Sequence, residues 1–267
     1  MIAALPMYDF PELQSAHDDL WSAVAGRLAA AGVRNVPRSL TRDLDHRAVW
    51  RHPELLLAQA CEYPLAKSFD EHLIIVATPR YSAPGCVGIL YKSAIVVRAE
   101  DPVGSLAGMR GRRCVVNELD SNSGMNLLRA ALAPLAAGAR FFDSVVVSGS
   151  HRRSLEMIAA NDADVAAIDC VTFAHLQRID LPLTRKIRVL GWTPPSPCLP
   201  LVTARTIGAG TLAKLRSALA AVFVDSALTP VRQRLLLDGI DLAPDATLSR
   251  VLKLERDAVE LRYPHVH

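Results

Sequence analysis

The sequence predicts an α/β fold of two lobes, each lobe a mostly parallel sheet flanked by helices. Short, continuous apolar segments alternate with helical patterns along the chain, which is typical of parallel sheets. The chain has 267 residues, more than one domain usually holds. A proline-rich segment, Trp192 to Pro197, interrupts the alternation and indicates a crossing between lobes.

The apolar segments have the length of buried strands, and the run Leu55-Leu56-Leu57 is bounded by prolines on both sides. Strands are expected at residues 2–8, 54–60, 73–77, 93–98, 114–116, 144–147, 165–168, 187–190 and 199–203. Apolar residues at helical spacing predict helices between them, at residues 13–28, 124–135, 152–160, 211–222, 231–238 and 248–261.

The outward crossing between lobes is expected at Tyr91-Lys92-Ser93. With the return crossing in the proline-rich segment, lobe I would comprise residues 1–92 and 195–267, and lobe II residues 93–194.

The composition excludes several classes of protein. Thirty basic and 27 acidic residues give a net charge of +3 without a basic run, so nucleic acid is not an expected partner. No apolar run approaches the length of a membrane-spanning helix. Five scattered cysteines form no CxxC pair, so we expect no metal site, and reduced thiols are favoured over disulfides.

The first residues carry no signal-peptide pattern. Met1 leads directly into an apolar segment, without a positively charged region or a cleavage site. As written, the sequence therefore predicts a chain that could remain in the cytoplasm.

Two loops between a strand and a helix carry the strongest local signal. The first contains Ser121, Asn122, Ser123 and Gly124, and the second ends in Ser150 and His151. Free N–H groups and the dipole at a helix start suit an oxyanion such as phosphate. The alternative is that Ser121 is simply a helix cap and that His151 is a surface or structural residue.

A third group of candidates stands at the ends of other apolar segments. Asp169 ends a strand, where parallel sheets place ligand sites, although it could equally cap the following helix. Four tyrosines could close over a ligand, although buried packing is the more common role of a tyrosine. They are Tyr8, Tyr63, Tyr81 and Tyr91.

No catalytic motif accompanies these residues. The sequence has no GxSxG, HExxH, P-loop or GxGxxG pattern, and no cofactor is expected. Ser123, His151 and Asp169 could be combined into a triad, but nothing local supplies a strained nucleophile turn. We therefore expect a protein that is not an enzyme.

In combination and in this order, the loops resemble the phosphate/phosphite/phosphonate substrate-binding family of ABC importers. The resemblance extends over nearly the whole chain. Its pieces include Met7-Tyr8-Asp9, the segment from Leu55 to Pro64, Thr78 to Tyr81, Gly85 to Gly88, Tyr91 to Ser93, Ser121 to Gly124, Ser148 to His151, and Ala163 to Asp169.

The resemblance implies the two-lobed type II periplasmic-binding-protein fold, in which the lobes close on a small anionic ligand in the cleft between them, and an ABC permease as partner. Ser121, Asn122 and Ser123 would hold the oxyanion and His151 would donate to it. Asp169 and the tyrosines would address the rest of the ligand, and the location implied is the periplasm. Two other functions stay open. One is a cytoplasmic enzyme on the same fold, similar to menaquinone- or thiamine-pathway proteins, and the other is a ligand sensor.

Overall fold

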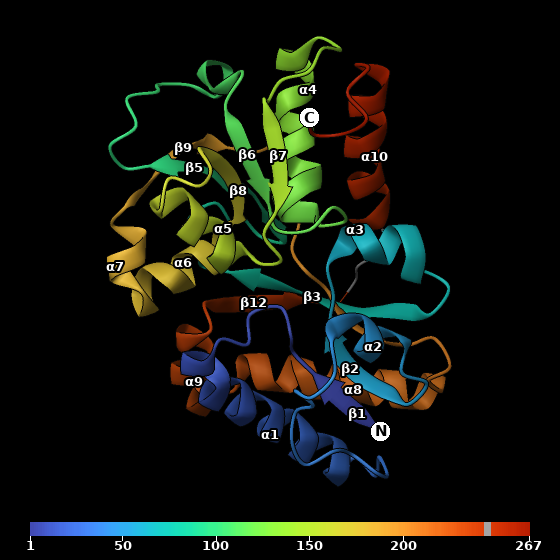
Figure 1. Ribbon diagram of the computed structural model, residues 1–267. Coiled ribbons are helices and arrows are strands. Elements are labelled where there is room, and N and C mark those ends of the chain that lie inside the picture. The colour runs from blue at the N-terminus through green and yellow to red at the C-terminus, as the bar shows by residue number, and fades with distance from the viewer. Residues whose placement is uncertain (243–246) are drawn as a thin grey trace. The chain divides into compact units, whose positions relative to one another are not determined.

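The computed structural model describes residues 1–242 and 247–267, and the chain divides into two compact α/β units. Unit 1 comprises Met1–Ser82, Val87–Ile89 and Cys198–Thr247. Unit 2 comprises Ala83–Cys86, Leu90–Pro197 and Leu248–His267. Each unit has a five-stranded sheet of its own with helices packed against it (Figure 1).

The sheet of unit 1 has the strand order β1-β2-β11-β3-β12. β1 and β2 are parallel, whereas β11 runs antiparallel to both of its neighbours and β12 runs antiparallel to β3. The strands are β1 (Ile2–Ala4), β2 (Leu55–Gln59), β3 (Leu73–Tyr81), β11 (Leu201–Ala204) and β12 (Leu237–Asp241).

The core of unit 1 lies between this sheet and two long helices, α1 and α8. Trp21 and Leu28 of α1 and Leu215 of α8 are buried against Leu56 of β2, as their helical spacing predicts. The helices are α1 (Gln14–Ala30), α2 (His46–Arg51), α3 (Glu62–Pro64), α8 (Ala209–Val224) and α9 (Thr229–Arg234), with short turns at Pro11–Leu13, Leu65–Phe69 and Ser226–Leu228.

The sheet of unit 2 has the order β7-β6-β8-β5-β9, and β6 is parallel to both β7 and β8. β5 is antiparallel to its two neighbours. The strands are β5 (Ser93–Arg98), β6 (Arg113–Val116), β7 (Ser144–Val147), β8 (Val165–Asp169) and β9 (Ile187–Trp192), and a separate short pair is formed by β4 (Leu90–Tyr91) and β10 (Ser196–Pro197).

Helices cover the sheet of unit 2, and α10 lies alongside α4 (Figure 1), where the side chain of Asn126 donates to the carbonyl of Val251. The helices are α4 (Leu127–Ala136), α5 (His151–Ala159), α6 (Cys170–Ile179), α7 (Leu181–Thr184) and α10 (Thr247–Glu260). A π-type turn, Asn122–Asn126, leads directly into α4, and a 3-10 turn spans Leu106–Met109.

The α/β class is confirmed, but the sheets are mixed rather than mostly parallel. In unit 1 the antiparallel strands are β11 and β12, which are formed after the chain has passed through unit 2. β11 enters between β2 and β3 in the opposite direction. Apolar content alone predicts a buried strand, and it does not reveal the direction in which a returning chain runs.

The segment at residues 231–238, predicted as one helix, is divided between two elements. α9 ends at Arg234, Leu236 adopts a left-handed conformation with φ of 58°, and β12 begins at Leu237. The left-handed residue stops the helix and turns the chain onto the edge of β3. The short helices α2, α3 and α7 were not predicted, and α6 was expected only as the helix that Asp169 could cap.

The C-terminal segment, predicted as part of lobe I, is grouped with unit 2. Its backbone carbonyls accept hydrogen bonds from the rest of unit 2. Arg129 Nη1 donates to the carbonyl of Pro264 at 2.9 Å, and the N–H of Phe141 donates to the carbonyl of His267 at 2.7 Å.

Candidate functional site

The start of the helix that runs through the π-type turn into α4 carries the first candidate residues. Ser121 is its N-cap, and its Oγ accepts a hydrogen bond from the N–H of Gly124 at 3.0 Å. The first N–H groups of any helix have no acceptor within the helix, so they are available to an anion. Ser121 therefore caps the helix, as one of the two interpretations of the sequence predicted.

The second loop reaches the same place. Ser150 caps α5 by accepting from the N–H of Arg153 at 3.1 Å, which makes His151 the first residue of that helix. The Nε2 atom of His151 lies 2.8 Å from Ser123 Oγ, and Ser121 Oγ lies 3.4 Å from Ser123 Oγ. The structure thus brings side chains from two helix starts, 28 residues apart in the chain, into one hydrogen-bonded group.

The imidazole of His151 is held in its neutral form. Burial lowers the pKa of His151 to about 4, so the ring is uncharged at neutral pH. Its Nδ1 is buried without a partner among the residues that the structure describes. If the ring proton resides on Nε2, the buried Nδ1 is an unpaired acceptor, which costs less free energy than an unpaired donor. Nε2–H then donates to Ser123 Oγ, and the serine hydroxyl hydrogen points elsewhere.

We expect acid to destabilise the folded chain through His151. Its pKa is lower when folded than the value of about 6.5 for an unfolded histidine, so the stabilisation is complete above that value and is lost as the pH falls toward 4. At pH 4.5 the loss reaches about 2–3 kcal/mol. Urea unfolding at pH 7 and at pH 4.5 measures this loss of stability. The variant His151→Gln cannot titrate, so its stability should fall by about 2–3 kcal/mol less than that of the wild type. Equal losses in the two proteins would contradict a lowered pKa of His151.

Asn122 and Tyr91, two of the predicted ligand residues, are turned into the interior of unit 2. The buried Asn122 amide donates to Tyr91 Oη at 3.1 Å and to Ser196 Oγ at 2.8 Å, and its oxygen accepts from Asn126 Nδ2 at 2.9 Å. Asn126 Oδ1 in turn accepts from buried Arg129. These side chains hold the helix start in place, and the Asn122 amide is engaged by partners inside unit 2.

Asp169 also has a structural role. Its carboxylate accepts from the N–H of Thr172 at 2.8 Å and caps α6. Ser93, which pairs with Asp169 across β5 and β8, donates through its Oγ to the carbonyl of Ser123 at 2.9 Å. Sequence reasoning missed Ser93, Ser196 and Asn126 as supports of the site, because a serine or asparagine beside a strand or helix carries no signal of a partner elsewhere in the chain.

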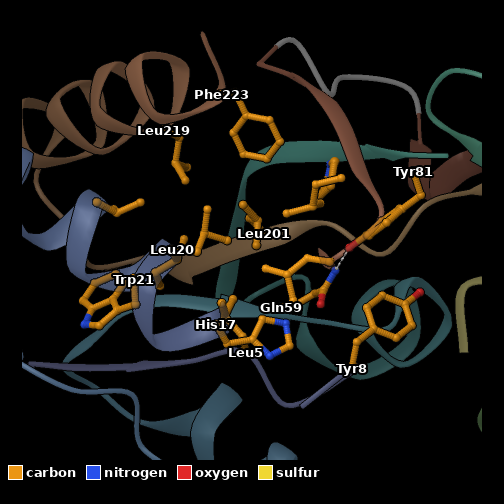
Figure 2. Close-up of a pocket in the computed structure, with 15 residues that line it drawn as sticks. Leu5, Tyr8, His17, Leu20, Trp21, Gln59, Tyr81, Leu201, Leu219 and Phe223 are labelled. Carbon is orange, nitrogen blue, oxygen red and sulfur yellow. Dashed lines mark hydrogen bonds between the residues drawn. The ribbon is translucent and has the colours of Figure 1, made fainter. Parts of the chain in front are cut away.

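The other three candidate tyrosines belong to unit 1. Tyr8 and Tyr81 meet edge to face with ring centroids 5.5 Å apart, and Tyr81 Oη accepts from Gln59 Nε2 at 2.7 Å (Figure 2). Tyr63 lies beside Lys67, whose Nζ is 6.0 Å from the ring centroid. All three tyrosine side chains are largely buried.

Tyr8 and Tyr81 border a mainly apolar cavity inside unit 1 (Figure 2). His17 and Trp21 come from α1, and Leu219 and Phe223 come from α8, so the cavity lies between these helices and the sheet. Its volume of about 40 Å³ is that of a few water molecules. It is a packing void rather than a pocket for a phosphate-sized anion.

Within residues 1–242 and 247–267, no three His, Cys, Asp or Glu side chains are grouped so that they could hold a metal ion. In the same residues, none of the helices combines the length and the apolar character needed to cross a bilayer.

The sequence matches a family model over residues 3–248, and the family is the periplasmic substrate-binding protein of ABC phosphonate transporters. The chain belongs to this family. No curated protein sequence matches the chain as a relative. The family is one of solute-binding components of importers, which confirms the class of protein that the sequence resembles.

Solved structures confirm the two-lobed fold of this substrate-binding protein. A binding-protein component of an ABC phosphonate transporter from Pseudomonas aeruginosa superposes with a TM-score of 0.78 at 16% identity, covering 97% of this chain and 86% of that one. PhnD1 from Prochlorococcus marinus, in complex with methylphosphonate, gives 0.76 at 14% identity and 97% coverage of both chains. XAC2383 from Xanthomonas citri, bound to ATP, gives 0.71 at 16% identity, covering 100% of this chain and 98% of that one.

Proposed function

We propose that this substrate-binding protein captures a phosphonate or a related tetrahedral oxyanion at the start of the helix that begins with Asn122. The observation that carries the proposal is the contact between Ser123 Oγ and His151 Nε2 at 2.8 Å, at a point where two helices begin. Hydroxyl and N–H donors with a helix dipole behind them suit a group with several charged oxygens.

Each part of the group has a distinct task in this proposal. Ser123 donates its hydroxyl hydrogen to the anion, because His151 Nε2–H occupies the acceptor side of the serine oxygen. The N–H groups of the first helical turn donate to the other oxygens. Ser121 keeps the turn in shape through its bond to the Gly124 N–H. Asp169, which caps α6 in the same unit, is a candidate for contact with the organic part of the ligand.

The ligand is released unchanged in this proposal, and an ABC permease in the membrane receives it from the periplasm. The neutral His151 forms a hydrogen bond with a serine, but no carboxylate is hydrogen-bonded to its Nδ1 among the described residues. A serine nucleophile needs a histidine base that is oriented by a third group. This arrangement supports binding over hydrolysis.

Titration calorimetry with methylphosphonate, phosphite, phosphate and methanesulfonate tests the proposal. We expect saturable binding of at least one phosphorus oxyanion, with one ligand per chain. Mass spectrometry after long incubation should recover that ligand intact. Failure of the chain to bind any of these anions, or the appearance of a product that disappears in His151→Ala, would count against a phosphonate-type binding protein.

A further inference from the structure

Two cysteines of unit 2 lie side by side outside the candidate anion site. The Sγ atoms of Cys86 and Cys170 are 3.4 Å apart, and the residues are 84 positions apart in the chain. Cys86 ends the short segment Ala83–Cys86, which belongs to unit 2 although the residues on both sides of it belong to unit 1. Cys170 is the first residue of α6 and follows Asp169.

The backbone around Cys86 is shaped for this approach. Gly85 has a φ of 101°, which side chains other than glycine rarely adopt. A Cβ atom placed on Gly85 would lie 2.7 Å from Cζ3 of Trp192 and 3.1 Å from Cβ of Cys170. Only a glycine lets the segment lie this close to β9 and to the start of α6. The proximity of the thiols is therefore a consequence of close backbone packing as well as of side-chain rotamers.

We propose that Cys86 and Cys170 are a disulfide-forming pair that closes when the protein meets a small-molecule or protein disulfide as oxidant. Both cysteines are thiols in the structure, which is therefore the reduced state. A bond of about 2.0 Å requires the sulfur atoms to approach by a little over 1 Å, which rotation of the two side chains can supply where the backbones are already close.

The exchange has two steps, and Cys86 reacts first because it is partly exposed whereas Cys170 is 1% exposed. The Cys86 thiolate attacks a sulfur of the oxidant RSSR, forming a mixed disulfide and releasing one thiolate, RS⁻. Cys170 then attacks Cys86 Sγ, and its proton passes to the departing sulfur, which leaves as a second thiol, RSH. Two electrons pass from the cysteines to the oxidant, which leaves as two thiols.

The second step is favoured over a lasting mixed disulfide because Cys170 is already at contact distance. The contact with Cys86, with burial in addition, raises the pKa of the Cys170 thiol. Cys86, the more exposed of the two, is therefore the thiol that the oxidant encounters first. Disulfides of this kind persist in an oxidising compartment such as the periplasm, where the family acts.

The bond would attach the segment Ala83–Cys86 to the start of α6, directly after the helix cap Asp169. It would also close a loop of 84 residues in the unfolded chain, which is long enough for a large entropic stabilisation. We therefore expect the oxidised protein to melt at a temperature roughly 5 °C or more above that of the reduced protein.

The test is oxidation of the reduced, full-length protein with oxidised glutathione at pH 8, followed by acid quenching and trypsin digestion. Cys86 lies in the tryptic peptide 81–92 and Cys170 lies in the peptide 154–178, and each peptide contains one cysteine. We expect one cross-linked species that joins these two peptides and disappears on reduction. Thermal unfolding of the oxidised and reduced forms provides the second measurement.

Three variants separate the pair from general thiol oxidation. Cys170→Ser should stop at a glutathione adduct on Cys86, and Cys114→Ser, in a fully buried position, should form the cross-link at the wild-type rate. Gly85→Ala should slow the cross-link at least tenfold relative to Gly88→Ala, which also has a positive φ but no neighbour within 4 Å. A wild-type protein that accumulates only the glutathione adduct, or a cross-link unaffected by Gly85→Ala, would overturn the proposal.

Discussion

Ser123→Ala is expected to weaken the binding of methylphosphonate, or of whichever phosphorus oxyanion binds most tightly, by about ten- to a hundredfold. A hydrogen bond between a hydroxyl and a charged oxygen contributes roughly 1.5–3 kcal/mol, and each 1.4 kcal/mol corresponds to a factor of ten in affinity. Ser123 Oγ is buried 2.8 Å from His151 Nε2, so the substitution also takes a hydrogen-bond partner from the imidazole. We therefore expect the ligand-free protein to lose about 1 kcal/mol of stability in addition to the loss of affinity.

Ser121→Ala is the matched control, since it removes a hydroxyl 3.4 Å from that of Ser123. Ser121 accepts from the Gly124 N–H, so its loss should cost about 1 kcal/mol of stability and leave the affinity nearly intact. Calorimetric titration together with thermal unfolding of both variants gives the four quantities needed. Wild-type affinity in Ser123→Ala for every anion that binds would mean that these loops are scaffolding.

Gly124→Ala should destabilise the fold by about 1–3 kcal/mol, the usual cost of forcing an extra methyl group into a packed site. A Cβ atom at this position would overlap Oδ1 of Asn117, would lie 2.9 Å from Cγ of the same side chain, and would lie 3.3 Å from Cε1 of His151. The new methyl group must therefore displace Asn117 and press on the ring that contacts Ser123. We expect reduced ligand affinity as well as a lower free energy of unfolding, measured by urea denaturation.

The double variant Gly124→Ala/Asn117→Ala shows whether the overlap is the cause. Asn117 Oδ1 is buried without a hydrogen-bond partner among the described residues, so its removal should cost little and should restore most of the stability. Gly26→Ala in α1 is the comparison for the substitution itself, because nothing lies within 4 Å of the added Cβ and alanine favours a helix. If the double variant is no more stable than Gly124→Ala, the overlap does not explain the loss.

Elements with a clear length and flanking residues were predictable from the sequence. Ser93–Arg98 and Ser144–Val147 have the bounds that their apolar runs predicted. The run Leu235-Leu236-Leu237 was ambiguous, because three leucines fit a helix as well as a strand. Leu237 begins a strand because it pairs with the edge of β3, and the residues near the leucines do not indicate this pairing.

Local chemistry by itself determined the fold class, the family resemblance and the helix caps. The caps Ser121 and Ser150 each bond an N–H three residues ahead, so neighbouring residues are sufficient to define them. Tertiary structure alone decided which side chains of the candidate site meet. Ser123 contacts His151 across 28 residues, whereas Asn122 turns inward to partners 31 and 74 residues away. A buried amide must find partners wherever the fold places them, and its orientation therefore depends on the whole of unit 2.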